Sequence, residues 1–482
     1  MNTRNAWSFP TALALFAALF APLHASAMTE EEEILIGRQA HAQILRQYRV
    51  YKDEKLHEYV RSVGSRLAAV GERPELKYTF TVLDSPEVNA FAAPGGYIYV
   101  TRGLMSYLNS EAELAAVLGH EVGHVALRHA ARGERNSQLT NMLGTLLAVA
   151  TGVPGAIFAG DFAGSVLTAG YGRGLELEAD EAGARYLAAT GYDPEAMIDV
   201  IRVLKDQEIF ELKRAEVEDR EPNVYHGVFA SHPSADTRLH EVVKKAGKAK
   251  EGAEGEVLNE FTFLNFSDGM MFGMSPAEPR RARGEQHNPD MGVGLRVPLG
   301  WIVKMGKNQI LAEPTDADAV LQVKAYKNTR ARDPKEVLMR RVGRDATLLD
   351  AYPVDVNGFP GYTAIAERAT SPFGPRNVRY GVVLVGDQAY IFAGAVQSTT
   401  DQLTYDAEFK RAITSLRLLT SKERDLARPR IIRLERVQPG MTFAYLAATS
   451  RLPHFAEEQL RLINGMFPEG EPEPGSYVKI LE

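Results

Sequence analysis

The chain contains no cysteine among its 482 residues. Disulfide bonds, an oxidisable thiol and a cysteine for lipid attachment are therefore all excluded for this sequence. A strong excess of charge is also missing, because 55 Lys and Arg stand against 62 Asp and Glu and give a formal net charge of −7. This acidic balance argues against a nucleic-acid-binding protein. The hydrophobic share of 45% is ordinary for a soluble globular protein, and the length predicts roughly two to four domains.

A hydrophobic run long enough to cross a membrane is missing from the start of the chain. Residues 11–21, TALALFAALFA, form an apolar stretch, whereas a spanning helix needs about 20 apolar residues. Arg4 precedes this stretch and Ala25-Ser26-Ala27 follows it in the A-x-A pattern, with no twin arginine. We interpret residues 1–27 as a cleaved secretory signal peptide, with an uncleaved anchor as the alternative. Export indicates a periplasmic protein, for which membrane or cell-wall association stays open.

The strongest motif is an H-E-x-x-H pattern inside residues 110–133, SEAELAAVLGHEVGHVALRHAARG. The segment opens with a capping box and carries apolar residues at helical spacing, so it predicts an amphipathic helix. His120 and His124 would then share one face and could direct two imidazoles at one Zn²⁺ ion per chain. Glu121 is offset by about 100°, which suits a base acting on a water at the metal. A chance pattern of core histidines is the alternative.

A second segment with helical character, residues 171–186 (YGRGLELEADEAGARY), supplies acidic partners. Glu176 and Asp180 are four residues apart and share a helix face, whereas Glu178 is offset from them. Glu176 could complete a His₂Glu zinc site with an open fourth position. Asp180 could accept the remaining ring N–H of a ligating histidine. Spacing alone does not decide between Glu176 and Glu178 as the ligand, and a solvated charged face is the alternative for the segment.

A β-hairpin is predicted directly before the motif helix. Residues 88–92 and 97–100 flank a Pro-Gly-Gly turn, and residues 78–83 form a further strand. An exposed strand edge near a metal site could hold an extended peptide substrate by β-augmentation, and a purely structural hairpin is the alternative. The candidate substrate-binding residues are Asn89, Ala90, Phe91 and Ala92.

Residues 139–170 form an apolar, glycine-rich stretch that Gly152-Val153-Pro154-Gly155 and Asp161 interrupt. Each half is shorter than a membrane span. We predict two helices that pack over or beside the metal site, with contact to a membrane surface as the alternative.

The rest of the chain divides into further domains. Residues 244–256 are rich in Gly, Ala, Lys and Glu, a composition typical of a linker. A first domain over residues 28–246 is therefore followed by linker or irregular chain over 247–290. Residues 291–420 predict an α+β accessory domain, and residues 429–482 predict the order strand, helix, helix, strand. The accessory elements expected are strands 320–326, 380–385 and 389–396 and helices 334–342 and 406–416.

Four motifs occur in order within residues 34–239. They are Asn89-Ala90-Phe91-Ala92 before Pro94-Gly95-Gly96, His120-Glu121-x-x-His124, Glu176-x-x-x-Asp180, and His232-Pro233 followed by Arg238. Together they resemble the gluzincin zinc metallopeptidases of the HtpX, Oma and CAAX-prenyl-protease group, and most closely the exported, BepA-like branch. The helical repeats that this branch carries at its C-terminus are absent from this sequence.

The resemblance implies a mainly helical gluzincin domain with a small β-hairpin or sheet, and zinc-dependent endopeptidase activity. It makes Glu176 the third zinc ligand and Asp180 the residue that supports a ligating histidine. It further implies that His232 can approach the zinc and hold the enzyme inactive. Arg238 is expected near the site as a catalytic group that acts as an electrophile or binds substrate. Protein or peptide substrates and the outer-membrane assembly machinery are the partners it suggests.

The last segment, residues 429–482, resembles a LysM-type module more weakly. The likeness rests on residues 437–442 (VQPGMT), where such modules often have a Gly-Asp-Thr turn, and on residues 460–465 and 474–480. Met441 stands in place of the Asp. The resemblance implies peptidoglycan binding, with a docking role for a divergent module as the alternative.

These features predict an α+β multidomain protein with a metallopeptidase domain, an accessory α+β domain and a small βααβ module. The leading hypothesis is a zinc endopeptidase that cleaves unfolded or misassembled cell-envelope proteins, with Glu121 as the base and His232 as a gate. An envelope chaperone or assembly scaffold with little proteolysis is one alternative. A cell-wall-binding protein led by its C-terminal module is the other, and no nucleic-acid partner is expected.

Overall fold

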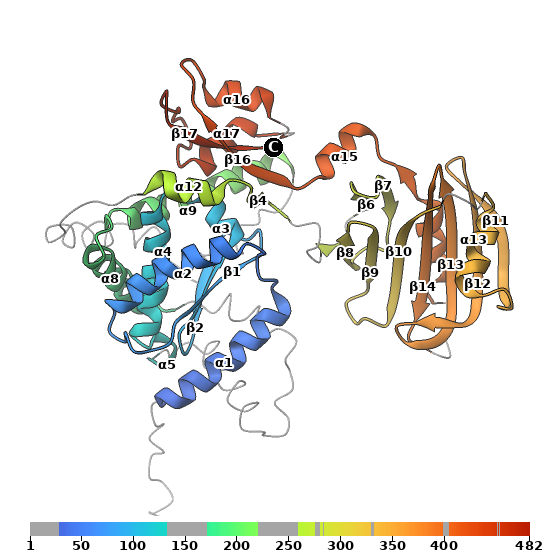
Figure 1. Cartoon of the computed structure of the whole chain (residues 1–482), viewed down its shortest axis with the longest axis horizontal. Coiled ribbons are helices and arrows are strands. Elements are labelled where there is room, and N and C mark those ends of the chain that lie inside the picture. The colour runs from blue at the N-terminus through green and yellow to red at the C-terminus, as the bar shows by residue number, and fades with distance from the viewer. Residues whose placement is uncertain are drawn as a thin grey trace, which may run out of the picture.

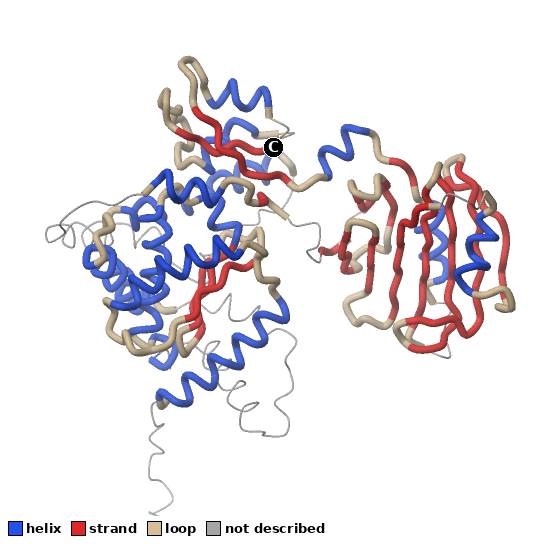
Figure 2. Tube along the Cα trace, viewed as in Figure 1, coloured by secondary structure: helices blue, strands red, loops and turns tan. Residues whose placement is uncertain are grey.

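The structure, a computed structural model, describes residues 28–132, 171–219, 259–274, 280–282, 284–328, 332–398, 404–450, 452 and 454–482. Figure 1 shows a mainly helical body beside a lobe dominated by strands, and Figure 2 shows the same division by secondary structure. The helical body contains the described residues up to 274 together with residues 430–482. The strand-rich lobe contains the described residues from 280 to 427 and is therefore inserted, in sequence, between two parts of the helical body. At this coarse level, the prediction of a protein that contains both helices and strands is confirmed.

The first part of the helical body arranges helices around a three-stranded sheet. β1 pairs in parallel with β3, and β3 pairs antiparallel with β2 across the turn at residues 94–96. The predicted hairpin is therefore confirmed, and the strand order β1-β3-β2 leaves β2 at an edge. The elements are α1 (Glu30–Gln47), α2 (Glu54–Ala69), β1 (Thr79–Leu83), β2 (Ala90–Ala93), β3 (Tyr97–Thr101), α3 (Arg102–Tyr107), α4 (Glu111–Ala126), α5 (His129–Arg132), α8 (Arg173–Ala189) and α9 (Ala196–Val217).

Helix α4 carries the H-E-x-x-H pattern, is buried along its whole length and packs against α2, α8 and α9. The Ser110 side chain accepts the N–H of Glu113 at 3.1 Å, as an N-cap residue should. In a capping box the Glu113 carboxylate would accept the N–H of the N-cap residue, Ser110. Here it accepts the N–H of the preceding residue, Asn109, at 2.8 Å. The end of the helix also differs from the prediction. Arg128 adopts a left-handed conformation with φ 56°, so the single helix expected over 110–133 is two helices, α4 and α5.

The C-terminal elements pack onto the helical body and share its core. β16 pairs with β17 and also with β4, which precedes the strand-rich lobe in sequence. Their apolar side chains belong to the same hydrophobic cluster as those of α4. The fully buried Lys479 of β17 donates hydrogen bonds from Nζ to the carbonyls of Ser106 and Leu108, each at 2.8 Å. The elements are α12 (Glu260–Ser267), β4 (Met271–Phe272), β16 (Arg430–Arg436), α16 (Phe443–Thr449), α17 (Ala456–Ile463) and β17 (Tyr477–Leu481), in the predicted strand, helix, helix, strand order from β16 onwards.

The linker expected over residues 247–290 differs from the structure in its described part. α12 and β4 are regular elements of the helical body, and β5 and β6 already belong to the strand-rich lobe. The buried Arg102 explains how β4 is held, because it donates hydrogen bonds to the carbonyls of Met271 and Gly273 at 2.6 and 2.9 Å. Residues 244–256, whose composition suggested the linker, lie outside the described residues.

The strand-rich lobe contains an eight-stranded antiparallel sheet in the order β11-β12-β13-β14-β10-β9-β8-β5 and a smaller sheet in the order β15-β7-β6. Helices α13 and α14 pack into two different apolar clusters, which the alternating side chains of the central strands supply. The strands are β5 (Arg280–Arg281), β6 (Glu285–Asn288), β7 (Val293–Arg296), β8 (Ile302–Gly306), β9 (Gln309–Glu313), β10 (Ala319–Lys327), β11 (Leu348–Val356), β12 (Phe359–Ser371), β13 (Gly374–Val385), β14 (Gln388–Val396) and β15 (Arg417–Leu418), and the helices are α13 (Pro334–Val342), α14 (Asp406–Thr414) and α15 (Ser421–Ala427).

The expected accessory elements correspond to β10, β13, β14, α13 and α14, while the other strands of the lobe were not predicted. Among the described helices of the whole chain, none combines the length and the apolar character that a membrane crossing requires.

Candidate metal centre

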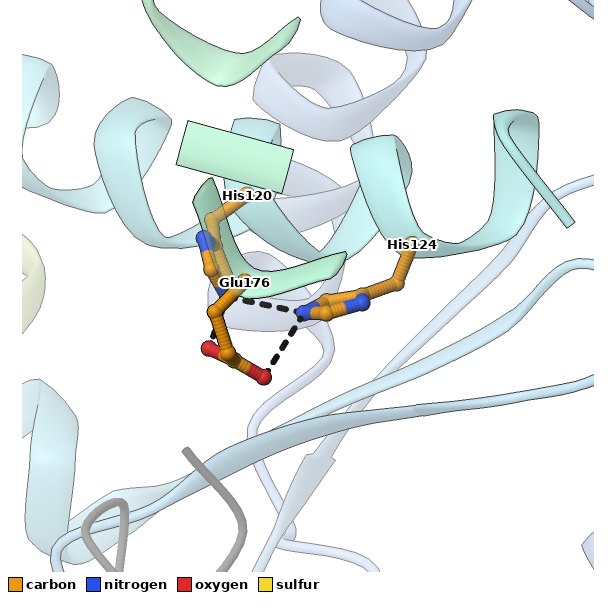
Figure 3. A group of neighbouring side chains, drawn as sticks. All are labelled: His120, His124 and Glu176. Atoms are coloured by element: carbon orange, nitrogen blue, oxygen red, sulfur yellow. Dashed lines mark hydrogen bonds and ion pairs between the residues drawn. The ribbon is translucent and has the colours of Figure 1, made fainter. Parts of the chain in front are cut away.

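Three buried side chains meet between α4 and α8. Nε2 of His120 lies 2.9 Å from Nε2 of His124, and each of these atoms lies 3.6 Å from an oxygen of Glu176. Figure 3 shows the two imidazoles and the carboxylate turned toward one another. Ligand atoms of a tetrahedral zinc site with bonds of about 2.0–2.1 Å are about 3.3 Å apart, so these spacings fit such a site. Two imidazoles and one carboxylate are also the donors of many catalytic zinc sites.

The close approach of α8 to α4 depends on small residues at their contact. A Cβ added at Gly123 would lie 3.1 Å from the carbonyl oxygen of Ala179, and one added at Gly183 would lie 3.1 Å from the backbone nitrogen of His120. Larger side chains would therefore push the two helices apart. The glycines let α8 bring Glu176 to the histidines of α4.

Asp180 lies one helical turn after Glu176 and supports His120. Its Oδ1 lies 2.9 Å from Nδ1 of His120, and both side chains are buried. A carboxylate at this position accepts the Nδ1–H, so that Nε2 stays unprotonated and faces the cluster. The contact is the one that the spacing of Glu176 and Asp180 predicted.

Glu178 points away from the cluster. Its carboxylate forms two hydrogen bonds with Arg132 of α5, at 2.7 and 3.1 Å, and is about half exposed. The hydrogen bonds from Arg132 lower the pKa of Glu178. The choice between Glu176 and Glu178, which helical spacing left open, therefore falls to Glu176 on geometry, because only its carboxylate lies beside the two histidines.

Glu121 lies on the same helix as both histidines and is almost completely buried, at 2% exposure. Tyr171 lies close by, since its ring stacks on that of His124 with a centroid distance of 4.2 Å. Burial raises the pKa of Tyr171, and the charges of Glu121 and Glu176 raise it further. Tyr171 was not among the predicted site residues, because an aromatic residue before a helix carries no distinguishing sequence signal.

His129 is a further residue of the site that was not predicted. It is fully buried, and its Nδ1 lies 2.8 Å from Nδ1 of His124. Burial, together with the charge of Arg132, lowers the pKa of His129 to about 4. A histidine five residues after a ligand was visible in the sequence, but helical spacing alone would have turned it away from the site.

The predicted peptide-binding strand lies beside the metal helix. β2 contacts α4, and no strand among the described residues pairs with its outer edge. Ala90 and Ala92 pair with β3, Asn89 exchanges hydrogen bonds with Thr101, and the Phe91 side chain packs on the ring of Tyr99 at 4.8 Å. The side chains of Asn89 and Phe91 are therefore buried, and what this edge can offer a peptide is its backbone.

Two predicted site residues, His232 and Arg238, lie outside the described residues, as do residues 1–27 and the apolar stretch 139–170. Their predicted roles are therefore carried forward as predictions.

Comparison with known proteins finds relatives for part of the chain. Residues 54–246 match the model described as Peptidase family M48. The chain is 32% identical over 209 residues to the beta-barrel assembly-enhancing protease of Yersinia pestis. This match covers 41% of this chain and 40% of that protein. It is 35% identical over 195 residues to the putative beta-barrel assembly-enhancing protease of Vibrio cholerae, over 38% of this chain and 40% of that protein. It is 34% identical over 143 residues to the mitochondrial metalloendopeptidase OMA1 of Arabidopsis thaliana, over 30% of this chain and 27% of that protein.

The family match covers the segment that supplies the metal cluster and none of the strand-rich lobe. The chain spans about two fifths of the length of the assembly-enhancing proteases that it matches. The resemblance drawn from the motifs is confirmed over part of the chain, because residues 54–246 match the model of Peptidase family M48.

Proposed function

We propose that the protein is a zinc-dependent endopeptidase that cleaves unfolded or misassembled proteins of the cell envelope. The observation that carries the proposal is the buried cluster of His120, His124 and Glu176 inside the segment that matches family M48. Its donor set and spacing suit zinc, and Glu121 follows the first ligand directly on the same helix.

The chemistry divides between the metal and the protein. Zinc, when bound, would lower the pKa of a water ligand and polarise the scissile carbonyl. His120 and His124 would hold it through Nε2 and Glu176 through its carboxylate, while Asp180 keeps the Nδ1 proton on His120. Glu121 would accept a proton from the attacking water and deliver it to the leaving amine, as a general base and then a general acid.

The edge of β2 is the proposed docking place for the substrate backbone. Pairing through backbone groups favours an extended chain over a particular sequence, because the alternating N–H and C=O groups are common to all peptides. Most strands of a folded protein are paired or have protected edges, which is why unfolded segments are the proposed substrates. Arg238 is proposed to stabilise the oxyanion, and His232 to block the metal at rest.

The proposed location and substrate class rest on two observations. Residues 1–27 have the pattern of a signal peptide, and the relatives over the peptidase segment are named for beta-barrel assembly. Proteins that fail to reach a folded state in the envelope would supply the extended segments that the β2 edge can bind.

Replacement of the base is the direct test. Glu121→Gln should lower the rate of casein cleavage by about 10²–10⁴-fold, because the amide cannot take up the proton of the water. Zinc content measured on the purified variant should equal that of the wild type. Glu181→Gln on the exposed side of α8 is the matched control and should cleave normally. Full proteolysis by Glu121→Gln would overturn the proposal.

An assembly factor with gated proteolysis is the second candidate, favoured by the names of the relatives and by the large strand-rich lobe outside the matched segment. Casein cleavage by the wild type and by His232→Ala separates the two. Faster cleavage by the variant supports a latent protease, whereas no cleavage by either supports the assembly factor.

Peptidoglycan binding by residues 429–482 stays a prediction. Because these residues share a hydrophobic cluster with α4, the pull-down should use the full chain with and without substitutions at exposed positions such as Tyr445.

A further inference from the structure

The two histidines of the cluster differ in the residue that contacts their Nδ1 atom, on the side of the ring away from the cluster. Nδ1 of His120 faces the Asp180 carboxylate at 2.9 Å, whereas Nδ1 of His124 faces Nδ1 of His129 at 2.8 Å. We propose that His129 is a positioning residue that accepts the Nδ1–H of His124, fixes the direction of its Nε2, and thereby strengthens metal binding. The inference rests on the proposed function, because it concerns the same metal site.

The hydrogen-bond direction follows from the geometry. Nε2 of His124 lies in the cluster, 2.9 Å from His120 and 3.6 Å from Glu176. It must be unprotonated to bind a metal, so the proton of this neutral ring sits on Nδ1. One of the two facing Nδ1 atoms must donate and the other accept. Since His124 donates, Nδ1 of His129 is the acceptor.

This assignment also fixes the other nitrogen of His129. Its proton must then lie on Nε2, which faces Oε2 of Glu178 at 3.5 Å. Arg132 holds that carboxylate through two hydrogen bonds. His124, His129, Glu178 and Arg132 therefore follow one another outward from the metal site, and the step from His129 to Glu178 is an electrostatic contact rather than a hydrogen bond. The arrangement at His124 resembles the direct contact between His120 and the Asp180 carboxylate, except that the ring of His129 lies between the ligand and the carboxylate.

His129 is not a further ligand. Its Nδ1 lies behind His124 and its Nε2 faces Glu178, so both nitrogens point away from the cluster. Among the described residues, the ligand atoms within 4.8 Å of one another come from His120, His124 and Glu176 alone. The role left for a fully buried histidine at this distance is to orient His124.

A break in the backbone brings His129 to this position. In an uninterrupted helix, His129 would be rotated by about 140° from His124. The left-handed Arg128 interrupts the helix and turns α5 back beneath α4. A side chain other than glycine is sterically strained in this conformation, at a cost in free energy. The cost is offset by contacts of Arg128, whose guanidinium donates to the buried Glu33 at 2.8 Å and to the carbonyl of Met28 at 2.7 Å.

The test compares two substitutions of similar size. His129→Leu removes the acceptor, whereas His129→Asn keeps an oxygen near the position of Nδ1. Zinc affinity is measured by competition with a chelator, and the ligand field by the visible absorption of the cobalt-substituted protein. His129→Leu should bind zinc about 10–100-fold more weakly with an altered cobalt spectrum, and His129→Asn should recover most of the affinity. The metal-free melting temperature of the asparagine variant should match that of the wild type.

A milder variant keeps the test decisive if the leucine variant does not fold. Glu178 is half exposed, so Glu178→Gln should fold normally and bind zinc a few-fold more weakly. His57→Asn, which changes a histidine on α2 bonded to the Tyr51 carbonyl, is the control and should bind zinc normally.

The outcomes separate this inference from the proposed function. A wild type that binds no zinc overturns both. A wild type that binds zinc while His129→Leu binds it equally well overturns only the role of His129. Equal losses in the leucine and asparagine variants also overturn it, because they would show that packing and not the acceptor matters.

Discussion

The helical body and the strand-rich lobe bury their polar groups in different ways. In the helical body, buried charged residues connect segments far apart in sequence, as Lys479 does with the carbonyls of Ser106 and Leu108. In the lobe, the principal buried charge is Arg379, which pairs with Asp350 and Asp406 at or near the surface. The remaining core of the lobe is formed by apolar clusters on the sheet.

The difference indicates which region tolerates change. A buried charge that loses its partner keeps its full desolvation cost. Removing one partner of such a contact should therefore strongly destabilise the helical body. The body is also where the metal cluster lies, and a cluster of three side chains on two helices requires fixed helix positions. The lobe has no comparable requirement among its described residues.

The largest expected effect is on stability, from Lys479→Met. The variant removes the Nζ donor of the Ser106 and Leu108 carbonyls and the charge that faces Glu113, so the helical body should lose about 3–5 kcal/mol. Arg379→Met in the lobe should cost less, because Asp350 and Asp406 can be solvated.

Trp301 is the single tryptophan after residue 7 and is buried in the lobe. Its fluorescence therefore follows the lobe, while far-UV circular dichroism follows mainly the helices of the body. Equal losses from the two variants would contradict the comparison.

The same substitution in each region sharpens the comparison. Gly394→Ala in β14 would put a Cβ 2.4 Å from the ring of Phe409, and should destabilise the lobe by about 1–3 kcal/mol without changing zinc affinity. Gly123→Ala in α4 would put a Cβ 3.1 Å from the carbonyl of Ala179. The gain in helix propensity of about 1 kcal/mol offsets its cost in stability, but the shift of α8 should weaken zinc binding. Unchanged zinc affinity in Gly123→Ala would argue against the glycine contact as the feature that places Glu176.

A further effect expected is a pH dependence confined to the helical body. Burial raises the pKa of Glu113 to about 7 and lowers that of Lys479 to about 7. From about pH 4.3 to 7 the folded state keeps a proton on Glu113 that the unfolded state has released, so stability falls as pH rises. From about pH 7 to 10.4 the unfolded state keeps the lysine proton that the folded state has released, so stability rises.

The contribution of the pair should therefore be least favourable near pH 7. The free energy of unfolding of the body, measured by denaturant titration from pH 5 to 9, should show this dip. Glu113→Gln combined with Lys479→Met should flatten it, whereas the lobe signal from Trp301 should not change between the two proteins. A wild-type profile that rises steadily across this range would contradict the prediction.

Local periodicity determined much of the helical body. A helical repeat places His120 and His124 on one face with Glu121 beside them, and β-rich runs around Pro-Gly-Gly predict the hairpin, because both depend on contacts within a few residues. The strand, helix, helix, strand order of the last segment follows in the same way. In the lobe, β11 was not predicted, because it is exposed on both faces over most of its length and so lacks the alternation that marks a strand.

The amino-acid sequence by itself determined the two helices that carry the candidate ligands, the base Glu121 next to His120 on the first of them, and the neighbouring hairpin. Only the tertiary structure decided which face of α8 meets α4, and hence Glu176 over Glu178, because that depends on the close approach at Gly123 and Gly183. It also decided the position of His129, because the turn at Arg128 is held by Glu33 of α1, 95 residues away in sequence. Finally, it joined the C-terminal strands to the first part of the helical body, because their apolar faces and Lys479 find partners there that no local pattern reveals.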